Sequence, residues 1–314
     1  MKEIIVDTLG ADNELELLKG TIESAKLFPD FSFVVYTNLQ KYGTFAANLD
    51  NIRYIDTEKS IKNNENPMTI IDENSDSSMA LSLKDLSKND NAIALISGGN
   101  TGALLVGSIY NVGTIAGIRF PALSALLVTT SLKRVAVVDC GANLDIQPQK
   151  AVEFAKLGAA LMSSLYDIEK PKVGLLNVGK ENKKGNDFAK KTYPLLAESD
   201  LDFVGNLEGE DIFDDSVNVV VTDGFSGNIL IKNSEVVAQI CRRLAIKNGD
   251  QQTADEIYKM FGYNDLGGAI LLGTKKIVMK AHGAGSARTI ISIVEMIEKM
   301  HKGNYIEKMH KYFD

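Results

Sequence analysis

One short pattern recurs five times along this 314-residue chain and limits what it can fold into. An apolar run that suits a buried strand ends in a turn rich in glycine, asparagine, serine or lysine. The first instance is the run from Ala92 to Ile96, which is followed by Ser97-Gly98-Gly99-Asn100-Thr101-Gly102. Glycine lets backbone N–H groups approach an anion, and a following helix adds partial positive charge. One such turn alone is as compatible with a tight connection that binds nothing.

The other four turns have a similar composition and follow runs that end at Val138, Leu176, Val221 and Met279. They read DCGAN, NVGKE with KKGN, DGFSGN and KAHGAG. Parallel strands end at one edge of a sheet, and open α/β sheets bind ligands beyond that edge. The repetition therefore predicts one composite anion site. We expect the following side chains to face a common cleft: Asn100, Asn143, Asn177, Lys184, Asn228 and His282.

Strands and helices alternate along most of the chain, as in a doubly wound α/β sheet. Strands are predicted over 4–6, 31–36 and 52–55, and a long polar surface loop over 56–78. The stretch 235–262 breaks the rhythm and is predicted to form a projecting helical hairpin. An amphipathic helix over 288–300 follows a last pair of strands near 269–279.

Composition excludes several classes of function. The net charge of −7 and the pI near 5.2 argue against nucleic-acid binding, which depends on clustered lysine and arginine. No apolar run reaches the roughly 18 residues that suggest a membrane span, and the first residues lack a signal-peptide pattern. Two cysteines do not make a disulfide framework, so a cytoplasmic location is expected.

The residue types in the turns also limit the chemistry. The three histidines and two cysteines form no cluster with metal-ligand spacing, so no metal is expected. Cys140 has no histidine near it in sequence, which favours a structural thiol over a nucleophile. The remaining asparagine, serine and glycine, with Lys184, Lys280 and His282, suit a site that holds an anion and stabilises an oxyanion. Attack of inorganic phosphate on a thioester needs these functions and no protein nucleophile.

The motifs resemble those of the bacterial phosphate acyltransferase (PlsX) family. They are SGGNTGA, D-x-GAN, GLLN-x-G with KGN, DGFSGN, GGA-x-LLG and KAHG, in the family's order and over nearly the whole chain. The resemblance implies one domain over residues 1–314, an α/β/α sandwich with a mostly parallel sheet, related to phosphotransacetylases and isocitrate dehydrogenases. It also implies a homodimer, peripheral contact with the membrane, and no cofactor. The expected substrates are inorganic phosphate and an acyl thioester of acyl carrier protein, which give acyl phosphate for phospholipid synthesis.

The resemblance also assigns roles to residues. The catalytic pair falls on Lys184 and Asn228. The residues expected to bind substrate or phosphate are Asp7, Gly10, Ser97, Asn100, Thr101, Gly102, Asn143, Asn177, Gly185, Asn186, Asp223, Ser226, Gly227, His282 and Gly283. The chain departs from the family's pattern in the segment 69–76, which is acidic where the family is basic.

Two alternatives stay open. A related enzyme would form acetyl phosphate, with Cys140 or Cys241 as acyl carrier. A catalytically inactive paralogue would sense a ligand or bind a partner. The hairpin carries charges of both signs and few contiguous apolar residues, so we expect weak or no membrane binding and a role in the dimer.

Overall fold

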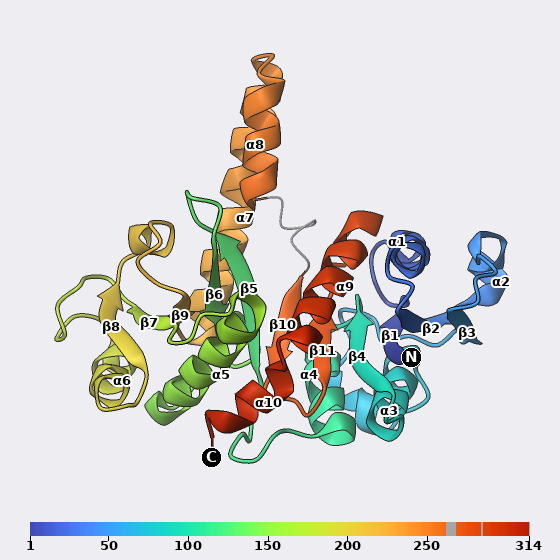
Figure 1. The fold of residues 1–314 in the computed structure, drawn as a ribbon, viewed down its shortest axis with the longest axis horizontal. Coiled ribbons are helices and arrows are strands. Elements are labelled where there is room, and N and C mark those ends of the chain that lie inside the picture. The colour runs from blue at the N-terminus through green and yellow to red at the C-terminus, as the bar shows by residue number, and fades with distance from the viewer. Residues whose placement is uncertain (262–267, 284, 314) are drawn as a thin grey trace. The chain divides into compact units, whose positions relative to one another are not determined.

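The computed structural model describes residues 1–261, 268–283 and 285–313, and the chain divides into two compact units (Figure 1). Unit 1 comprises Met1–Pro121 and Asn264–His301, and unit 2 comprises Ala122–Tyr263 and Lys302–Asp314. Gly262, where the predicted hairpin ends, and Gly267 and Ala284, in two of the glycine motifs, lie outside the described residues. The single domain expected over residues 1–314 stays a prediction.

Unit 1 contains six strands in the order β3-β2-β1-β4-β11-β10. All neighbours in this order are parallel except β10 and β11, which are antiparallel. The order reverses between β1 and β4, and doubly wound folds place ligands outside the carboxyl ends of strands at such a switch point. The bounds are β1 Lys2–Asp7, β2 Phe31–Thr37, β3 Ile52–Asp56, β4 Ala92–Ser97, β10 Ala269–Leu272 and β11 Ile277–Lys280.

The helices of unit 1 pack closely against one another through glycine. A Cβ atom on Gly20 of α1 would lie 2.4 Å from the carbonyl oxygen of Ala287 at the start of α9. Right-handed crossovers that run in opposite directions from the switch point place α1 and α3 on opposite faces of the strands. The helices are α1 Glu14–Leu27, α2 Leu39–Tyr42, α3 Ser78–Lys88, α4 Thr101–Gly107 and α9 Ala287–Lys302, with short turns η1 Gly43–Phe45, η2 Pro67–Ile71 and η3 Ser108–Val112.

Unit 2 contains five strands in the order β5-β6-β9-β7-β8. Strands β5 and β6 are antiparallel, and β6, β9, β7 and β8 are parallel, so their carboxyl ends share one edge. Three of the five predicted glycine turns leave this edge. The bounds are β5 Ala122–Val128, β6 Arg134–Val138, β7 Lys172–Leu176, β8 Asp202–Leu207 and β9 Val219–Val221.

The helices of unit 2 are α5 Pro148–Tyr166, α6 Asp187–Ala197, α7 Gly224–Lys247, α8 Gln251–Phe261 and α10 Tyr305–Lys311, with a short turn η4 Glu210–Ile212. Gly158 lets α5 lie directly on Val219 of β9. Helices α7 and α8 form a hairpin that leaves the strands of unit 2 (Figure 1). The doubly wound α/β architecture and the hairpin predicted from the sequence are confirmed. No helix in the described ranges is long and apolar enough to span a bilayer.

Candidate active site

At the switch point of unit 1, two buried side chains shape the first glycine turn. The Ser97 hydroxyl donates a hydrogen bond to Oδ2 of Asp7 (2.8 Å) and accepts one from the backbone N–H of Gly99 (3.2 Å). Leu9 N–H donates to the other carboxylate oxygen of Asp7 (3.3 Å). Burial raises the pKa of Asp7 to about 6, while the hydroxyls of Ser78 and Ser97 act in the opposite sense. Asp7 and Ser97 are fully buried, so in unit 1 they act on the backbone of this turn.

Asn100 is used twice by the fold of unit 1. Its side-chain oxygen accepts from Ala103 N–H (3.0 Å) and caps α4. Its side-chain nitrogen donates to three backbone carbonyls of the segment 62–65, at 3.0 to 3.4 Å. A Cβ on Gly102 would lie 2.6 Å from Pro67, so the same segment also covers the start of α4. Asn100 is buried beneath it, whereas its neighbour Thr101 is exposed.

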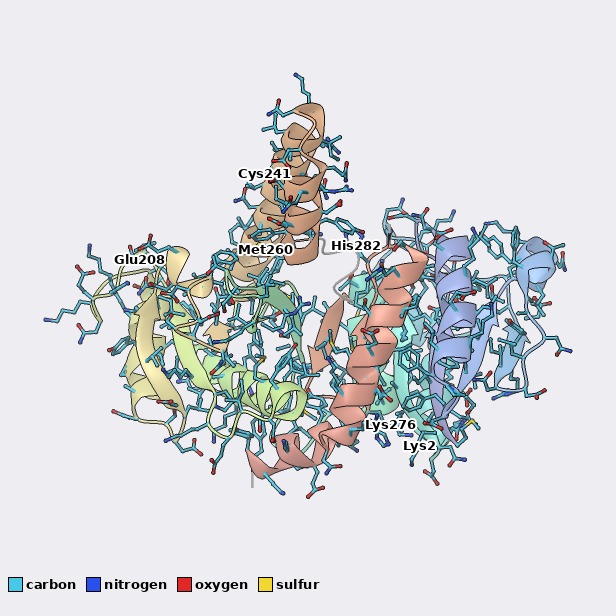
Figure 2. The ribbon with its side chains drawn as sticks, turned by 45° about the horizontal axis from the view of Figure 1, so that its top comes forward. Lys2, Glu208, Cys241, Met260, Lys276 and His282 are labelled. Carbon is cyan, nitrogen blue, oxygen red and sulfur yellow. The ribbon has the colours of Figure 1, made fainter. Side chains whose placement is uncertain are left out.

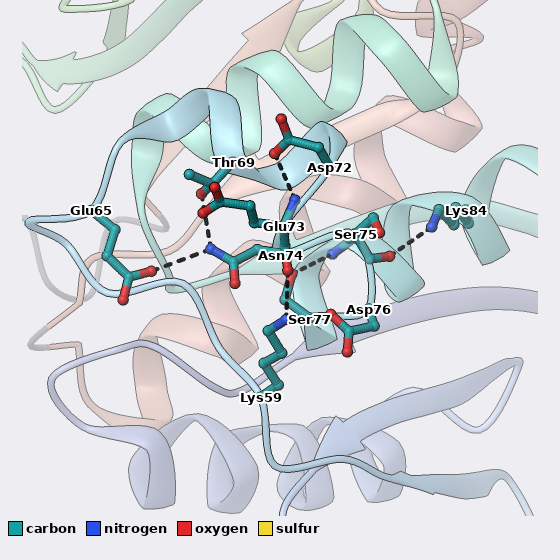
Figure 3. Close-up of polar contacts among 11 residues, drawn as sticks. Lys59, Glu65, Thr69, Asp72, Glu73, Asn74, Ser75, Asp76, Ser77 and Lys84 are labelled. Atoms are coloured by element: carbon teal, nitrogen blue, oxygen red, sulfur yellow. Dashed lines mark hydrogen bonds and ion pairs between the residues drawn. The ribbon is translucent and has the colours of Figure 1, made fainter.

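The segment 69–76 is expected from the resemblance to be basic, and its acidic stretch 72–76 is bound by two lysines (Figure 3). Lys59 donates to the carbonyl oxygen of Glu73 (2.6 Å) and to the carboxylate of Asp76 (2.5 Å). Lys84 donates to the carbonyl oxygen of Ser75 (2.6 Å). Both ammonium groups are therefore engaged with the loop itself.

The turn after β11 closes the same edge of unit 1. Lys280 donates to the carbonyl oxygen of Gly98 (3.1 Å), and Asn13 N–H donates to that of Gly283 (3.0 Å). Gly10 adopts a positive φ of 73° and donates to the Glu14 carboxylate (3.1 Å). Unit 1 thus brings together the following predicted residues: Asp7, Gly10, Ser97, Asn100, Thr101, Gly102, His282 and Gly283.

In unit 2 the turn after β6 is wrapped around a carboxylate that the sequence reasoning did not select, Asp139. Its Oδ1 accepts from the N–H groups of Leu123 (3.1 Å), Gly141 (3.0 Å) and Ala142 (3.0 Å). Its Oδ2 accepts from the backbone (2.8 Å) and the side chain (2.7 Å) of Asn143. Burial raises the pKa of Asp139, and these hydrogen bonds oppose the shift. The aspartate that opens the D-x-GAN motif was the available signal.

The first turn of α7 lies against this loop with glycine on its contact face. A Cβ on Gly227 would lie 1.9 Å from the carbonyl oxygen of Asp139, and one on Gly224 would lie 2.5 Å from that of Asn143. Asp223 caps the helix, because its carboxylate accepts from the backbone N–H (2.8 Å) and the hydroxyl (2.9 Å) of Ser226.

Asn228 differs from the other asparagines of the glycine turns. It lies one turn into α7 and packs over Gly141, where a Cβ would be 3.5 Å from its side-chain oxygen. Gly141 has a φ of 131°, which favours glycine. Among the described residues, the side-chain amide of Asn228 makes no hydrogen bond. By contrast, Asn100, Asn143, Asn177 and Asn186 all use their side-chain amides within the fold.

Lys184 lies on the loop between β7 and α6, and the side chains of Asn177 and Asn186 hold this loop. Asn177 donates through its side chain to the carbonyl oxygen of Lys184 (3.2 Å), and Asn186 caps α6 by accepting from Ala189 N–H (2.9 Å). Gly185 has a φ of 95°, and a Cβ there would lie 2.2 Å from the Asn177 oxygen. The Lys184 side chain is 56% exposed, and Glu181 at 4.0 Å is its one ion-pair partner among the described residues.

Unit 2 therefore gathers the turns after β6, β9 and β7, which are adjacent strands. These turns carry Asn143, Asn177, Lys184, Gly185, Asn186, Asp223, Ser226, Gly227 and Asn228. A single site that joins them with the turns of unit 1 stays a prediction. Sequence reasoning missed Asp139 and Asn206, and a buried asparagine on an edge strand leaves no signal in a single sequence.

Neither cysteine has the environment of an acyl carrier at Asn228. Cys140 is buried, and burial raises the pKa of its thiol well above the ordinary value, which disfavours the thiolate. Cys241 is exposed on the hairpin (Figure 2), thirteen residues beyond Asn228 on the same helix. At 1.5 Å per residue these two side chains start about 20 Å apart along α7. Within the described ranges, no group of three or more His, Cys, Asp or Glu side chains is placed to hold a metal.

The comparisons with known proteins identify the same family as the motifs of the glycine turns. The profile of the family described as "Fatty acid synthesis protein" matches residues 2–308. A phosphate acyltransferase from Anoxybacillus flavithermus is 33% identical over 318 residues, which cover 97% of this chain and 96% of that protein. The chain belongs to the phosphate acyltransferase family. The family and the enzyme class predicted from the sequence, an acyltransferase of fatty acid and phospholipid synthesis, are therefore confirmed.

Solved structures outside the family share the fold of this phosphate acyltransferase. A phosphotransacetylase from Streptococcus pyogenes superposes with a TM-score of 0.64 at 16% identity and covers 98% of this chain and 94% of its own. An isocitrate dehydrogenase from Methylococcus capsulatus has a TM-score of 0.50 at 10% identity, with 98% of this chain and 88% of its own covered. At these identities the likeness concerns the fold alone, and the fold predicted from the resemblance is confirmed.

Proposed function

We propose that this chain transfers an acyl group from a thioester of acyl carrier protein to inorganic phosphate. A phosphate oxygen attacks the carbonyl carbon, and the carbonyl electron pair moves onto oxygen to give a tetrahedral oxyanion. When the intermediate collapses, the C–S bond breaks and the electron pair leaves with sulfur. The thiolate takes a proton, and acyl phosphate is the second product.

Asn228 is proposed to donate to the oxyanion. The observation that carries this assignment is that the side-chain amide of Asn228 makes no hydrogen bond with the described residues. The side-chain NH2 groups of Asn100, Asn143 and Asn177 already donate within the fold, and the side-chain oxygen of Asn186 caps α6. A donor with no partner in the fold can bind charge that develops in the transition state without first breaking a hydrogen bond.

Lys184 is proposed to bind the attacking phosphate. Its ammonium is mostly exposed and has a loose ion pair, so it remains available to an anion. The remaining predicted residues would contribute chiefly backbone N–H groups, because their side chains hold the turns that present those groups. Attack on the thioester requires phosphate to be held and oriented, and this accounts for several kcal/mol of the barrier in well-oriented reactions.

The test is release of free thiol from purified protein supplied with phosphate and one of three donors: acyl carrier protein, acyl-CoA or an acetyl thioester. We expect Lys184→Ala and Asn228→Ala each to lower turnover about a hundredfold or more, the usual cost of losing one such donor. Lys183→Ala is the matched control, because the exposed side chain of Lys183 makes no hydrogen bond or ion pair with the described residues. Undiminished turnover in Lys184→Ala or Asn228→Ala removes that residue from the mechanism.

The same assay separates the two alternatives. Turnover with the acetyl thioester alone would identify an enzyme that forms acetyl phosphate. No thiol release from any donor, with phosphate binding retained, would identify a ligand-sensing paralogue.

We also infer that the hairpin serves a homodimer more than a membrane surface. Helix α7 exposes a stripe of about half-exposed apolar side chains at helical spacing, formed by Val236, Val237, Ile240 and Leu244. Arg243, Lys247 and Asp250 lie on or next to the same part of the hairpin and are exposed. Interfacial helices need a wide apolar face with basic flanks, and this stripe is narrow. A second copy of α7 offers a matching stripe.

A further inference from the structure

We propose that Asn206, together with Asn177, is a positioning residue for Lys184; this proposal rests on the proposed function of Lys184. Asn206 lies on the edge strand β8, next to β7, and its register partner is Leu175. Nothing in its sequence context marks it as functional. Its contact with the Lys184 loop does.

Asn206 is almost completely buried and holds the loop by a backbone oxygen. Its side-chain nitrogen donates to the carbonyl oxygen of Glu181 (2.9 Å). Its side-chain oxygen is buried and has no partner among the described residues. A buried polar atom left unpaired carries a free-energy cost, so an apolar residue would suit the strand better. The hydrogen bond to the loop is what an asparagine adds at this position.

The Glu181 carbonyl connects Asn206 to Lys184. The same oxygen accepts from the backbone N–H of Lys184 (3.0 Å), so Asn206 fixes the acceptor that fixes Lys184. Asn177 holds the other side of the residue, since its side-chain nitrogen donates to the Lys184 carbonyl oxygen (3.2 Å). Both backbone polar groups of Lys184 are therefore tied, directly or in one step, to a side-chain amide: that of Asn177, directly after β7, or that of Asn206, within β8.

The other contacts of this loop fix the backbone around Lys184, whereas the Lys184 side chain stays mostly exposed. Asn177 is itself fixed, because its backbone N–H donates to the carbonyl oxygen of Leu207 (2.8 Å) and its side-chain oxygen accepts from Val178 N–H (2.9 Å). Lys180 anchors the start of the loop to Asp211 (2.8 Å). A Cβ on Gly179 would lie 3.4 Å from Cγ of Lys184, so this glycine leaves room for the lysine stem.

This arrangement answers a specific problem of lysine as a phosphate ligand. Its ammonium lies at the end of a flexible four-carbon stem, and on a loop both the stem and the backbone could move. A misplacement of about 1 Å can lower a rate by about a hundredfold. Fixing the backbone of Lys184 to β8 and to the residue that follows β7 removes one of the two sources of misplacement.

The experiment is a double-mutant cycle on the full chain, with thiol release as the readout. Asn206→Leu removes the amide and keeps the volume, and Asn206→Asp removes the donor and keeps the shape. We expect each to lower kcat about tenfold or more, with KM for the thioester within about twofold, as for a residue that acts on placement. In the Lys184→Ala background, Asn206→Leu should lower kcat by less than about twofold, because residues that act as a unit are not additive. Asn177→Ala should behave in the same way.

Asn218→Ala is the matched control. Asn218 braces the opposite end of β7 by accepting from Lys172 N–H (2.9 Å), and its loss should leave kcat within about twofold. An unchanged kcat in the Asn206 variants overturns the proposal while Lys184 keeps its role. A loss of the same size with and without Lys184 overturns it too, since it shows a general effect on the fold. If Lys184→Ala itself retains full turnover, the proposed role of Lys184 fails and the positioning role fails with it.

Discussion

Replacement of Asp7 by asparagine should make the protein more stable at neutral pH and nearly as stable as the parent in acid. Asp7 is completely buried, and its pKa in the fold is about 6 against 3.8 for the free side chain, chiefly because burial disfavours the charged form. Asparagine has the same shape and keeps an oxygen for Leu9 N–H, but it never ionises. The Ser97 hydroxyl can turn to accept from the new amide.

The sign and size follow from the two pKa values. Below pH 3.8 the Asp7 carboxyl is protonated in both the folded and the unfolded state, so it does not change the free energy of unfolding with pH. As the pH rises from 3.8 to about 6, the unfolded state releases its proton first, so the free energy of unfolding falls. The shift is about 2 pH units, which corresponds to about 3 kcal/mol at 1.36 kcal/mol per unit. About half of this difference develops above pH 5.

Urea unfolding at a series of pH values from 5 to 8 measures the effect. The difference in unfolding free energy between Asp7→Asn and the parent should grow with pH by about 1 to 1.5 kcal/mol over this interval and level off above pH 7. Asp30→Asn, at an exposed aspartate, is the matched control. A difference between Asp7→Asn and the parent that does not change with pH would refute the reasoning, because it would mean that Asp7 ionises in the fold as freely as in water.

Two further predictions concern packing and association. Gly227→Ala should destabilise the protein by about 1–3 kcal/mol in thermal unfolding, since its Cβ would meet the Asp139 carbonyl at 1.9 Å, whereas Gly209→Ala, with nothing within 4 Å, should be neutral. Leu244→Glu should convert the proposed dimer to monomer in light scattering, and both the parent and the variant should sediment only weakly with anionic vesicles. Tight sedimentation that Leu244→Glu abolishes while the dimer survives would assign the stripe to lipid instead.

Much of the fold could be predicted because the strands are visible in the sequence as apolar runs followed by glycine turns. The run 92–96 and the strand Val219–Val221 are apolar throughout, as strands covered on both faces must be, and each is followed by a glycine turn. The start of the hairpin was less accessible. The expected hairpin begins at residue 235, whereas α7 already begins at Gly224. Glycine at positions 224 and 227 suggests a turn, but tertiary contact requires it there, because the helix touches the backbone of the β6 turn.

The sequence could not predict which asparagine side chains of the site bind the fold itself and which remain available to a ligand. Asn100 and Asn228 look alike in sequence, since each follows a glycine in a turn. Only the packing of the segment 62–65 shows that the side-chain nitrogen of Asn100 already donates to three backbone carbonyls. Likewise, nothing near Asn206 in sequence reveals that the chain returns with Glu181 beside it. Contacts between residues distant in the chain decide which polar groups remain for a ligand.

The start of α7 shows what those remaining groups can do. Among its first N–H groups, Gly224 donates to Asn143, Ser226 to the Asp223 carboxylate, and Gly227 to the Asp223 carbonyl oxygen. The N–H of Phe225 has no partner in the described part of the chain. Side chains on a helix lean toward its N-terminus, so we expect the amide of Asn228, three residues later, to extend toward the same turn. An oxyanion held by Asn228 would therefore meet a second free donor and the positive end of a 24-residue helix.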